Sequence, residues 1–278
     1  MVLFLALFSF SQAYGYGYDG IHWFLPNPMG ESYLINPNCA DPEAGTQAEQ
    51  IAAISNGANT WNTQGKAKFS FIYGGTTTKT LPDDSHVSSY NDYNEIMFVQ
   101  DPDYWLFKES PAVCAVTFVW YYTYTKEIFE CDMAFNDINF IWNGVGQPTI
   151  QEVDIWNEAT HEFGHFLMLN DLYNTSDSEK TMYWMAAKGE SKKRDLDPDD
   201  IAGIQYIYGV RYKCGDANGD DQVNVTDVIY LINYLFKGGP APVNMGAADV
   251  DGNGSLNVGD VIYLINYLFK GGPAPKCQ

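Results

Sequence analysis

The sequence predicts an α+β domain with a mixed sheet, followed by a small all-α domain. Three observations predict this class. Strand-like and helix-like segments are mixed up to about residue 210, two helices are expected after the last strand, and the remainder of the chain contains a tandem repeat. We therefore expect the two domains to span residues 14–210 and 211–278, with YGVRYK as a short connector.

The chain begins with an apolar run, MVLFLALFSF, followed by SQA. This pattern predicts a signal peptide over residues 1–13, cut after Ala13, and hence a secreted, extracellular or cell-surface protein. No Lys or Arg precedes the run, so a truncated start is considered, and the alternative to a signal is a first buried strand. No internal apolar run approaches the roughly 20 residues that span a bilayer.

The composition favours a packed, acidic protein. The 278 residues include 35 Asp and Glu against 15 Lys and Arg, which gives a formal net charge of −20. Such a surface repels phosphate backbones, so nucleic acid is not an expected partner. It suits proteins that bind hard cations through carboxylates.

Five cysteines leave at least one thiol unpaired. Cys214 and Cys277 bracket the last segment of the chain, so a disulfide between them is plausible in an exported protein. The pairing of Cys39, Cys114 and Cys131 cannot be read from the sequence.

The elements of the first domain follow from residue patterns. IHWFL is expected to begin a first strand, and GTQAEQIAAISNGANTWN has the apolar spacing of an amphipathic helix. The segments KFSFIYG, NEIMFVQ, AVTFVWYYT and EIFECDMAF read as strands, the last two being rich in aromatic and β-branched residues. Two helices are expected over residues 153–167 and 197–208, the second with Asp197 as N-cap and Pro198 in the first helical position.

The sequence HEFGH, residues 161–165, predicts a metal site. Positions i and i+4 of a helix share one face, so His161 and His165 can reach one ion. Glu162 is placed to hold a metal-bound water and take its proton. The alternative, two surface histidines, does not explain why half of the four histidines fall in one pentapeptide.

A catalytic zinc needs three protein ligands and one open position. Asp171 is the nearest downstream carboxylate, and it can return to the metal if the helix ends just after His165. The alternative third ligand is a distant glutamate, either Glu179 or Glu190.

Several strings resemble the metzincin zinc proteases. HEFGHFLMLND resembles their motif HExxHxxGxxH/D with Asp171 in the last place, and KTMYWM resembles their Met-turn with Met182 as the family methionine. LDPDDIAGIQYIYG and CDMAFND resemble the C-terminal helix and a strand of the matrixins. Met168 stands where the family has glycine. Since positive φ costs a non-glycine residue about 1–2 kcal/mol, either Met168 bears that strain or Asn170 takes the left-handed position.

The resemblance implies a metzincin-like fold: a mixed, mostly parallel twisted sheet, an active-site helix and a C-terminal helix. It implies an endopeptidase with one catalytic Zn²⁺ bound by His161, His165 and Asp171, and with Glu162 as general base. The strand AVTFVWYYT would pair with an extended substrate at the sheet edge. The specificity pocket would lie near residues 183–193.

The C-terminal repeat contains two loops, DANGDDQVNVTD and DVDGNGSLNVGD, each followed by DVIYLINYLFKGGPAP. Side-chain oxygens recur at loop positions 1, 3, 5 and 12, position 7 offers its carbonyl, and Asn224 and Asn257 at position 9 could bind through water. This alternation suits one Ca²⁺ in each loop; the alternative is a pair of solvated turns. The expected calcium residues are Asp216, Asn218, Asp220, Gln222 and Asp227, then Asp249, Asp251, Asn253, Ser255 and Asp260.

The repeat resembles the type I dockerin module, which implies a cohesin domain of a scaffold protein as partner. By that resemblance, loop positions 10 and 11 contact the partner: Val225, Thr226, Val258 and Gly259. Asp221 replaces the common glycine at position 6 of the first loop, so a tighter turn and a lower calcium affinity are expected there.

The sequence thus predicts a secreted zinc endopeptidase, tethered through a calcium-dependent dockerin to a cohesin-bearing scaffold. Two alternatives remain open. One is a catalytically silent protease fold that acts only as a calcium-dependent binding module. The other is a structural calcium module on a cell surface.

Overall fold

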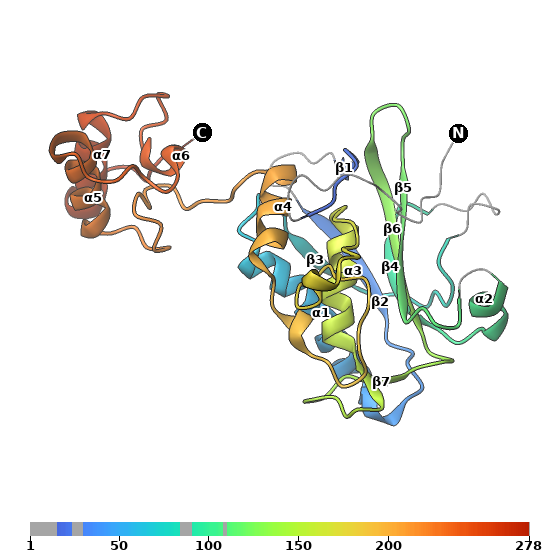
Figure 1. Ribbon diagram of the computed structural model, residues 1–278. Coiled ribbons are helices and arrows are strands. Elements are labelled where there is room, and N and C mark those ends of the chain that lie inside the picture. Colours follow the sequence, from blue (N-terminus) through green and yellow to red (C-terminus); the bar gives the residue numbers. More distant parts are fainter. Residues whose placement is uncertain (1–15, 24–29, 84–90, 108–109, 278) are drawn as a thin grey trace. The chain divides into compact units, whose positions relative to one another are not determined.

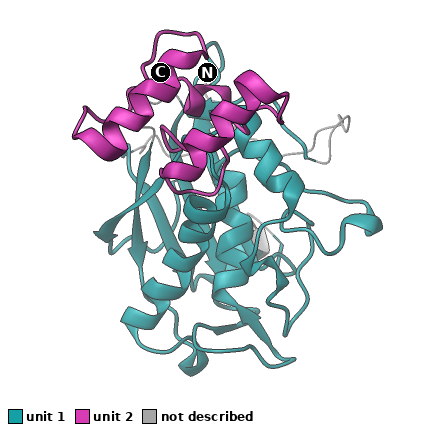
Figure 2. Ribbon diagram, turned by 90° about the vertical axis from the view of Figure 1, so that its left-hand side faces the viewer, with its two compact units in different colours: residues 1–210 teal, residues 211–278 magenta. Residues whose placement is uncertain are grey.

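The computed structural model describes residues 16–23, 30–83, 91–107 and 110–277. The predicted signal peptide lies outside these residues. The chain divides into two units, Met1–Val210 and Arg211–Gln278 (Figure 2).

The first unit is built on a mixed, mostly parallel sheet, which confirms the predicted fold class (Figure 1). The strand order is β1-β6-β4-β2-β3, and these neighbours are all parallel. β5 pairs antiparallel with β6 and has no other partner among the described residues, so it forms an edge. The bounds are β1 His22–Trp23, β2 Glu31–Asn36, β3 Phe71–Thr76, β4 Asn94–Val99, β5 Ala115–Tyr121 and β6 Glu127–Asn136.

Two helices, α1 (Gln47–Gln64) and α3 (Ile155–Phe166), lie side by side on one face of this sheet (Figure 1). They approach closely at Gly57, where an added Cβ would lie 2.8 Å from the backbone of Ala159. The main core fills the space between these helices and the sheet. Because α1 and α3 share this core, their relative position is fixed by packing.

The remaining elements of the first unit are short, apart from α4. Trp105 of α2 packs with Phe118 and Trp120 in a second cluster that includes residues of β4, β5 and β6. These elements are α2 Pro102–Phe107, β7 Ile141–Asn143, β8 Glu152–Asp154, α4 Pro198–Tyr208 and the 3₁₀ turns Pro42–Ala44, Thr175–Asp177 and Lys192–Arg194.

The sequence analysis missed β2, which lies inside the sheet between β4 and β3. Only Tyr33 and Ile35 of its six residues are fully buried, so its apolar pattern is too short to stand out. The strands and helices that the sequence analysis did predict are present within a few residues of their predicted bounds.

The second unit is helical, as predicted, with α5 (Val225–Lys237), α6 (Met245–Ala248) and α7 (Val258–Lys270). The repeated helices pack together through equivalent residues, Val228 and Leu231 of α5 and Val261 and Leu264 of α7. A disulfide joins Cys214 to Cys277, as the sequence suggested.

Cys39, Cys114 and Cys131 are free thiols. Among the described residues, no helix combines the length and apolar character needed to cross a bilayer.

Candidate metal centre

The helix α3 that carries HEFGH is anchored at both ends. Asp154 caps its start, where its carboxylate accepts a hydrogen bond from the backbone N–H of Asn157 (2.7 Å) and pairs with the guanidinium of Arg194. At its end, the indole N–H of Trp23 donates to the carbonyl of Phe166 (2.9 Å). These contacts fix the helix, and with it the two histidines, relative to the sheet.

Both histidines direct their Nε2 atoms toward the same point. Nδ1 of His161 lies 2.8 Å from the carbonyl of Thr181, and Nδ1 of His165 lies 2.8 Å from the carbonyl of Leu169. Because a carbonyl only accepts, each Nδ1 carries the proton and donates it. The Nε2 atoms, which then present lone pairs, lie 3.1 Å apart.

Asp171 completes the group. Its Oδ1 lies 3.3 Å from Nε2 of His161 and 3.5 Å from Nε2 of His165. This oxygen is buried without a hydrogen-bond donor, whereas Oδ2 accepts a hydrogen bond from the hydroxyl of Tyr173 (3.2 Å). Ligand atoms of a tetrahedral zinc, with bonds of about 2.0–2.1 Å, stand about 3.3 Å apart. The three atoms therefore fit a zinc ion.

The electrostatics of the group agree with this fit. Burial lowers the pKa of His165, but the Asp171 carboxylate outweighs burial and raises it to about 9. Burial raises the pKa of Asp171, yet the two imidazoles bring it well below its usual range. The three side chains thus stabilise positive charge at their centre, and two imidazoles with one carboxylate are a known ligand set of catalytic zinc.

The other candidate ligands lie elsewhere. Glu179 pairs with Lys192 (3.0 Å), and Glu190 lies 3.6 Å from the same ammonium. Neither carboxylate joins the two histidines in a group that could hold a metal within the described residues. Of these candidates, the structure brings Asp171 to the histidines.

Met168 makes the turn that returns the chain to the metal. Its φ is +69°, so Met168, and not Asn170, bears the left-handed strain. Its side chain is fully buried in the main core. Burial of this side chain offsets the backbone cost of about 1–2 kcal/mol.

Met182 lies directly against the zinc-motif helix. An added Cβ on Gly164 would lie 2.2 Å from Sδ of Met182, so the glycine between the histidines leaves room for the methionine. The backbone N–H of Leu172 donates to the carbonyl of Met182 (2.8 Å). This bond ties the segment of Asp171 to the segment beneath the helix.

Glu162 is 3% exposed and is held from the edge strand. The hydroxyl of Thr117 in β5 donates to its carboxylate Oε2 (2.6 Å). Burial raises the pKa of Glu162, while the two histidines and the Thr117 hydrogen bond oppose the rise. A carboxylate with a raised pKa suits proton transfer near neutral pH.

The sequence analysis did not identify Thr117, Tyr173 or Lys193. Lys193 is buried, and its ammonium donates to the carbonyl of Tyr183 (2.5 Å) and lies 3.4 Å from Nδ1 of His161. Only the position of Tyr173, two residues beyond Asp171, offered a local signal. The contacts of Thr117 and Lys193 bridge separate elements, so no local pattern marks them.

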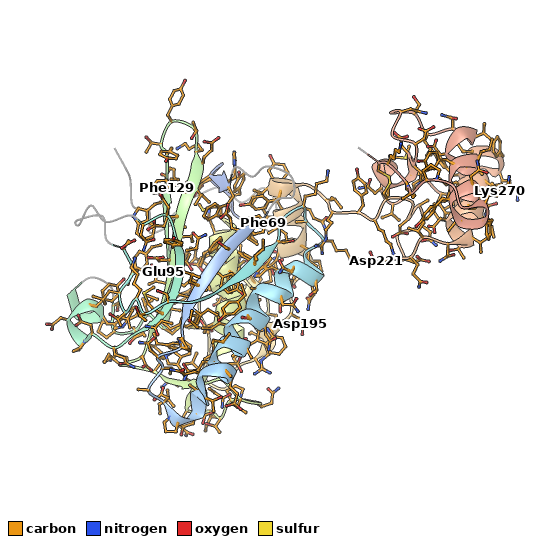
Figure 3. All side chains as sticks on the ribbon, turned by 180° about the vertical axis from the view of Figure 1, so that it is seen from behind. Phe69, Glu95, Phe129, Asp195, Asp221 and Lys270 are labelled. Atoms are coloured by element: carbon orange, nitrogen blue, oxygen red, sulfur yellow. A yellow bond between two sulfur atoms is a disulfide. The ribbon has the colours of Figure 1, made fainter. Side chains whose placement is uncertain are left out.

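Two further groups of potential ligands occur among the described residues of the first unit. One is Cys39 with Asp41 and Asp137, in which the Cys39 thiol donates to Asp137 (3.2 Å). The other is Asp83, Glu130 and Asp132, all buried; the backbone N–H of Glu95, which Figure 3 labels, donates to the Asp132 carboxylate (2.9 Å). The ammonium of Lys79 lies within 4 Å of three carboxylates there: Asp83 (2.6 Å), Glu95 (3.1 Å) and Asp132 (3.8 Å).

In the second unit, each predicted calcium loop brings three carboxylates together. Their oxygens lie within 4.8 Å of one another in both loops. Burial raises the pKa of Asp227 and of Asp260, the last residue of each loop. Such crowding of carboxylates fits a hard cation with oxygen ligands. The groups are Asp216, Asp220 and Asp227, and Asp249, Asp251 and Asp260.

The other loop positions shape the backbone around these carboxylates. Oδ1 of Asn218 accepts from the N–H of Asp220 (3.0 Å), and the N–H of Gln222 donates to the Asp220 carboxylate (2.9 Å). In the second loop, Oδ1 of Asn253 accepts from the N–H of Ser255 (2.9 Å). These bonds draw each loop around the acidic residues.

Asn224 and Asn257, expected to bind calcium through water, serve as N-caps of α5 and α7. The residues expected to contact a partner stand in the first turns of these helices. Val225 and Val258 are about half exposed there. The four residues expected to contact a partner are Val225, Thr226, Val258 and Gly259.

Comparisons with known proteins agree with both units. The family model described as matrixin matches residues 58–209, and that of the dockerin type I domain matches residues 214–269. Metalloendoproteinase 5-MMP of Arabidopsis thaliana is 38% identical over 73 residues, 26% of this chain and 18% of that protein. Metalloendoproteinase 2-MMP of the same plant is 44% identical over 57 residues, 20% of this chain and 14% of that protein. The matches thus span less than a fifth of the length of either relative.

Proposed function

The chain belongs to the matrixin family, whose model covers more than half of it, and on that premise we propose that it is a zinc-dependent endopeptidase tethered through its dockerin domain. The matched relatives are metalloendoproteinases by name. One observation carries the proposal: two bare imidazole nitrogens and one donor-free carboxylate oxygen converge on a single point. Three acceptors at such distances repel one another unless a positive charge, a proton or a metal ion, lies between them.

Zinc, when bound, supplies a Lewis acid that lowers the pKa of a water molecule and polarises the scissile carbonyl group. His161 and His165 would hold it through Nε2, and Asp171 through Oδ1. Glu162 accepts the proton of the attacking water and later returns it to the nitrogen of the leaving amine. Because Oε2 of Glu162 accepts from Thr117, Oε1 is the oxygen left for that proton.

The substrate would bind as an extended chain along β5. Among the described residues this strand pairs with β6 alone, and its other edge would offer main-chain hydrogen bonds to an extended chain. Thr117 lies on β5 and contacts Glu162 directly, so a substrate on this edge would lie beside the proposed general base. We assign the specificity pocket to the segment of residues 183–193.

The dockerin domain would bind one Ca²⁺ in each loop and dock a cohesin on a scaffold protein. Val225 and Thr226 of α5, and Val258 and Gly259 of α7, would contact that partner. The two first turns differ in sequence, so the two faces are not equivalent. Secretion, which the N-terminal segment suggests, would place the enzyme on an extracellular scaffold.

Peptide-library and casein cleavage by the full chain, loaded with zinc and calcium, tests the enzyme. Glu162→Gln should lower kcat by at least about 100-fold, the scale of general-base catalysis. Glu179→Gln, at an exposed side chain outside the metal group, is the matched control and should cleave normally. Equal turnover by wild type and Glu162→Gln, or no turnover by zinc-loaded wild type, rejects the endopeptidase.

A further inference from the structure

The two carboxylate oxygens of Asp171 have different surroundings. Oδ1 is buried near both imidazoles and has no hydrogen-bond donor within the described part of the chain. Oδ2 accepts a hydrogen bond from the hydroxyl of Tyr173 (3.2 Å). Within the described part of the chain, no other side chain donates to Oδ2. The two oxygens of the carboxylate therefore differ. Oδ1 is available to a metal ion, whereas Oδ2 already accepts a hydrogen bond.

Tyr173 is about half exposed, and two contacts restrain it. The ring packs against that of Trp184, with centroids 6.2 Å apart and planes 33° from parallel. Trp184 also donates its backbone N–H to the carbonyl of Leu172 (3.2 Å), next to Tyr173 in the chain. Backbone pairing and ring packing thus fix Tyr173 relative to the segment that begins at Met182.

A carboxylate ligand creates a problem that an imidazole does not. Its two oxygens are chemically equivalent, so it can bind one metal ion through both. Bidentate binding would add a second oxygen next to the position that a catalytic site keeps open for water or substrate, and would crowd that position. A donor on one oxygen prevents this, because that oxygen must give up its hydrogen bond before it can turn to the metal.

We propose, resting on the zinc site of the proposed function, that Tyr173 is a positioning residue for the third metal ligand. Its hydroxyl occupies Oδ2, so Asp171 offers only Oδ1 to the metal. Hydrogen-bonded partners of this kind are typically worth about 10–100-fold in metal affinity. Trp184 supports the arrangement by holding the ring of Tyr173.

The test compares metal binding by the wild-type full chain and by Tyr173→Phe, both with calcium present. Zinc affinity, measured by competition with a chromophoric chelator, should fall by about 10–100-fold in the variant. The visible spectrum of the Co²⁺-loaded chain should lose intensity, because a released Oδ2 raises the coordination number above four. Tyr124→Phe, at a 97% exposed tyrosine on the β5–β6 turn, is the matched control and should leave both readouts unchanged.

Repeating Tyr173→Phe in a second variant, Asp171→His, distinguishes a positioning role of Tyr173 from a general effect on stability. In Asp171→His the ligand has no Oδ2, so adding Tyr173→Phe should change zinc affinity little. No loss in the wild-type background, or the same loss in both backgrounds, overturns the proposal. Should Asp171→His fail to fold, the cobalt spectrum of Tyr173→Phe decides alone.

These measurements do not depend on peptide cleavage. If zinc affinity behaves as expected while zinc-loaded wild type cleaves no peptide, the positioning role stands and the endopeptidase falls. If peptide is cleaved but Tyr173→Phe binds zinc as tightly as wild type, the enzyme stands and the positioning role falls. A chain that binds no zinc rejects both.

Discussion

The hydroxyl of Thr117 and the carboxylate of Glu162 form a 2.6 Å hydrogen bond between the edge strand β5 and the helix α3. The same hydroxyl lies 3.2 Å from the backbone carbonyl of Glu162. One side chain on the predicted substrate-binding strand therefore restrains the predicted general base.

Removing this hydroxyl should weaken catalysis without removing the metal. Thr117→Val keeps the shape of the side chain and deletes a hydrogen bond to a charged group, worth about 1.5–3 kcal/mol. We expect kcat to fall by about 10–100-fold, while zinc content and KM stay near wild type. Thr117→Ser keeps the hydroxyl and should retain most of the activity. Steady-state kinetics with metal analysis decides, and equal loss in the Val and Ser variants would contradict the role of the hydroxyl.

Met168→Gly should destabilise the first unit although it relieves backbone strain. The strain at φ +69° is worth about 1–2 kcal/mol. Deleting a fully buried methionine side chain costs about 2–5 kcal/mol, so the loss of packing is larger. Urea unfolding should show a net loss of stability of about 1–3 kcal/mol. A gain in stability would mean that strain outweighs packing at this turn.

Asp221→Gly offers the matched comparison, because Asp221 also has positive φ (+62°) but is exposed in its calcium loop (Figure 3). Its counterpart in the second loop, Gly254, has φ +81°. No buried side chain is lost here, so the variant should stabilise the second unit by up to about 1 kcal/mol. Calcium should bind the first loop more tightly, as read by titration of helicity.

The stability of the first unit should fall as pH rises from about 5 to 8. Burial, followed by the nearby Asp83 carboxyl, raises the pKa of Glu130, and burial raises that of Asp132 to about 7. Unfolded carboxyls titrate near 4, so between pH 4 and neutrality the folded state binds more protons than the unfolded state. The free energy of unfolding must then decrease with rising pH.

Glu130→Gln tests this origin of the pH dependence. Its amide oxygen can still accept from the N–H groups of Asn91 and Asp92, and its NH₂ can donate toward the donor-free Oδ2 of Asp83. The variant should lose part of the decline in melting temperature between pH 5 and 8. Glu127→Gln, at the start of the same strand, is the control and should keep the wild-type profile. An unchanged profile in Glu130→Gln would contradict a proton held on this side chain.

Removing calcium should unfold the helices of the second unit. Each loop gathers three carboxylates, and Asp227 and Asp260 are fully buried, so their repulsion is uncompensated once the cation is chelated. Chelation should therefore lower helicity and the melting temperature of this unit. The Cys214–Cys277 disulfide, which closes a sequence separation of 63, should limit the loss, since such a loop is worth about 4 kcal/mol.

Circular dichroism with and without a chelator, in oxidised and reduced protein, measures both contributions. The loss on chelation should be larger after reduction. If chelation leaves the helices intact in reduced protein, the loops do not depend on calcium for their fold.

The local parts of the site could be predicted from residue spacing alone. The spacing of His161 and His165 places both on one helix face, because the α-helix repeats every 3.6 residues. The carboxylates of the two repeated loops are likewise set by their positions in a short turn. Most strands and helices could be predicted for the same reason, since their residue patterns repeat over a few residues.

The contacts that join separate elements became visible only in the folded chain. The fold brings Asp171, and not Glu179, to the histidines through a turn at Met168. Burial of the Met168 side chain offsets the backbone strain of that turn. The fold also places Thr117 beside Glu162, 45 positions apart in the chain. Such contacts depend on how helices pack on the sheet, and packing is a property of many distant residues at once. A local sequence pattern therefore does not predict such contacts.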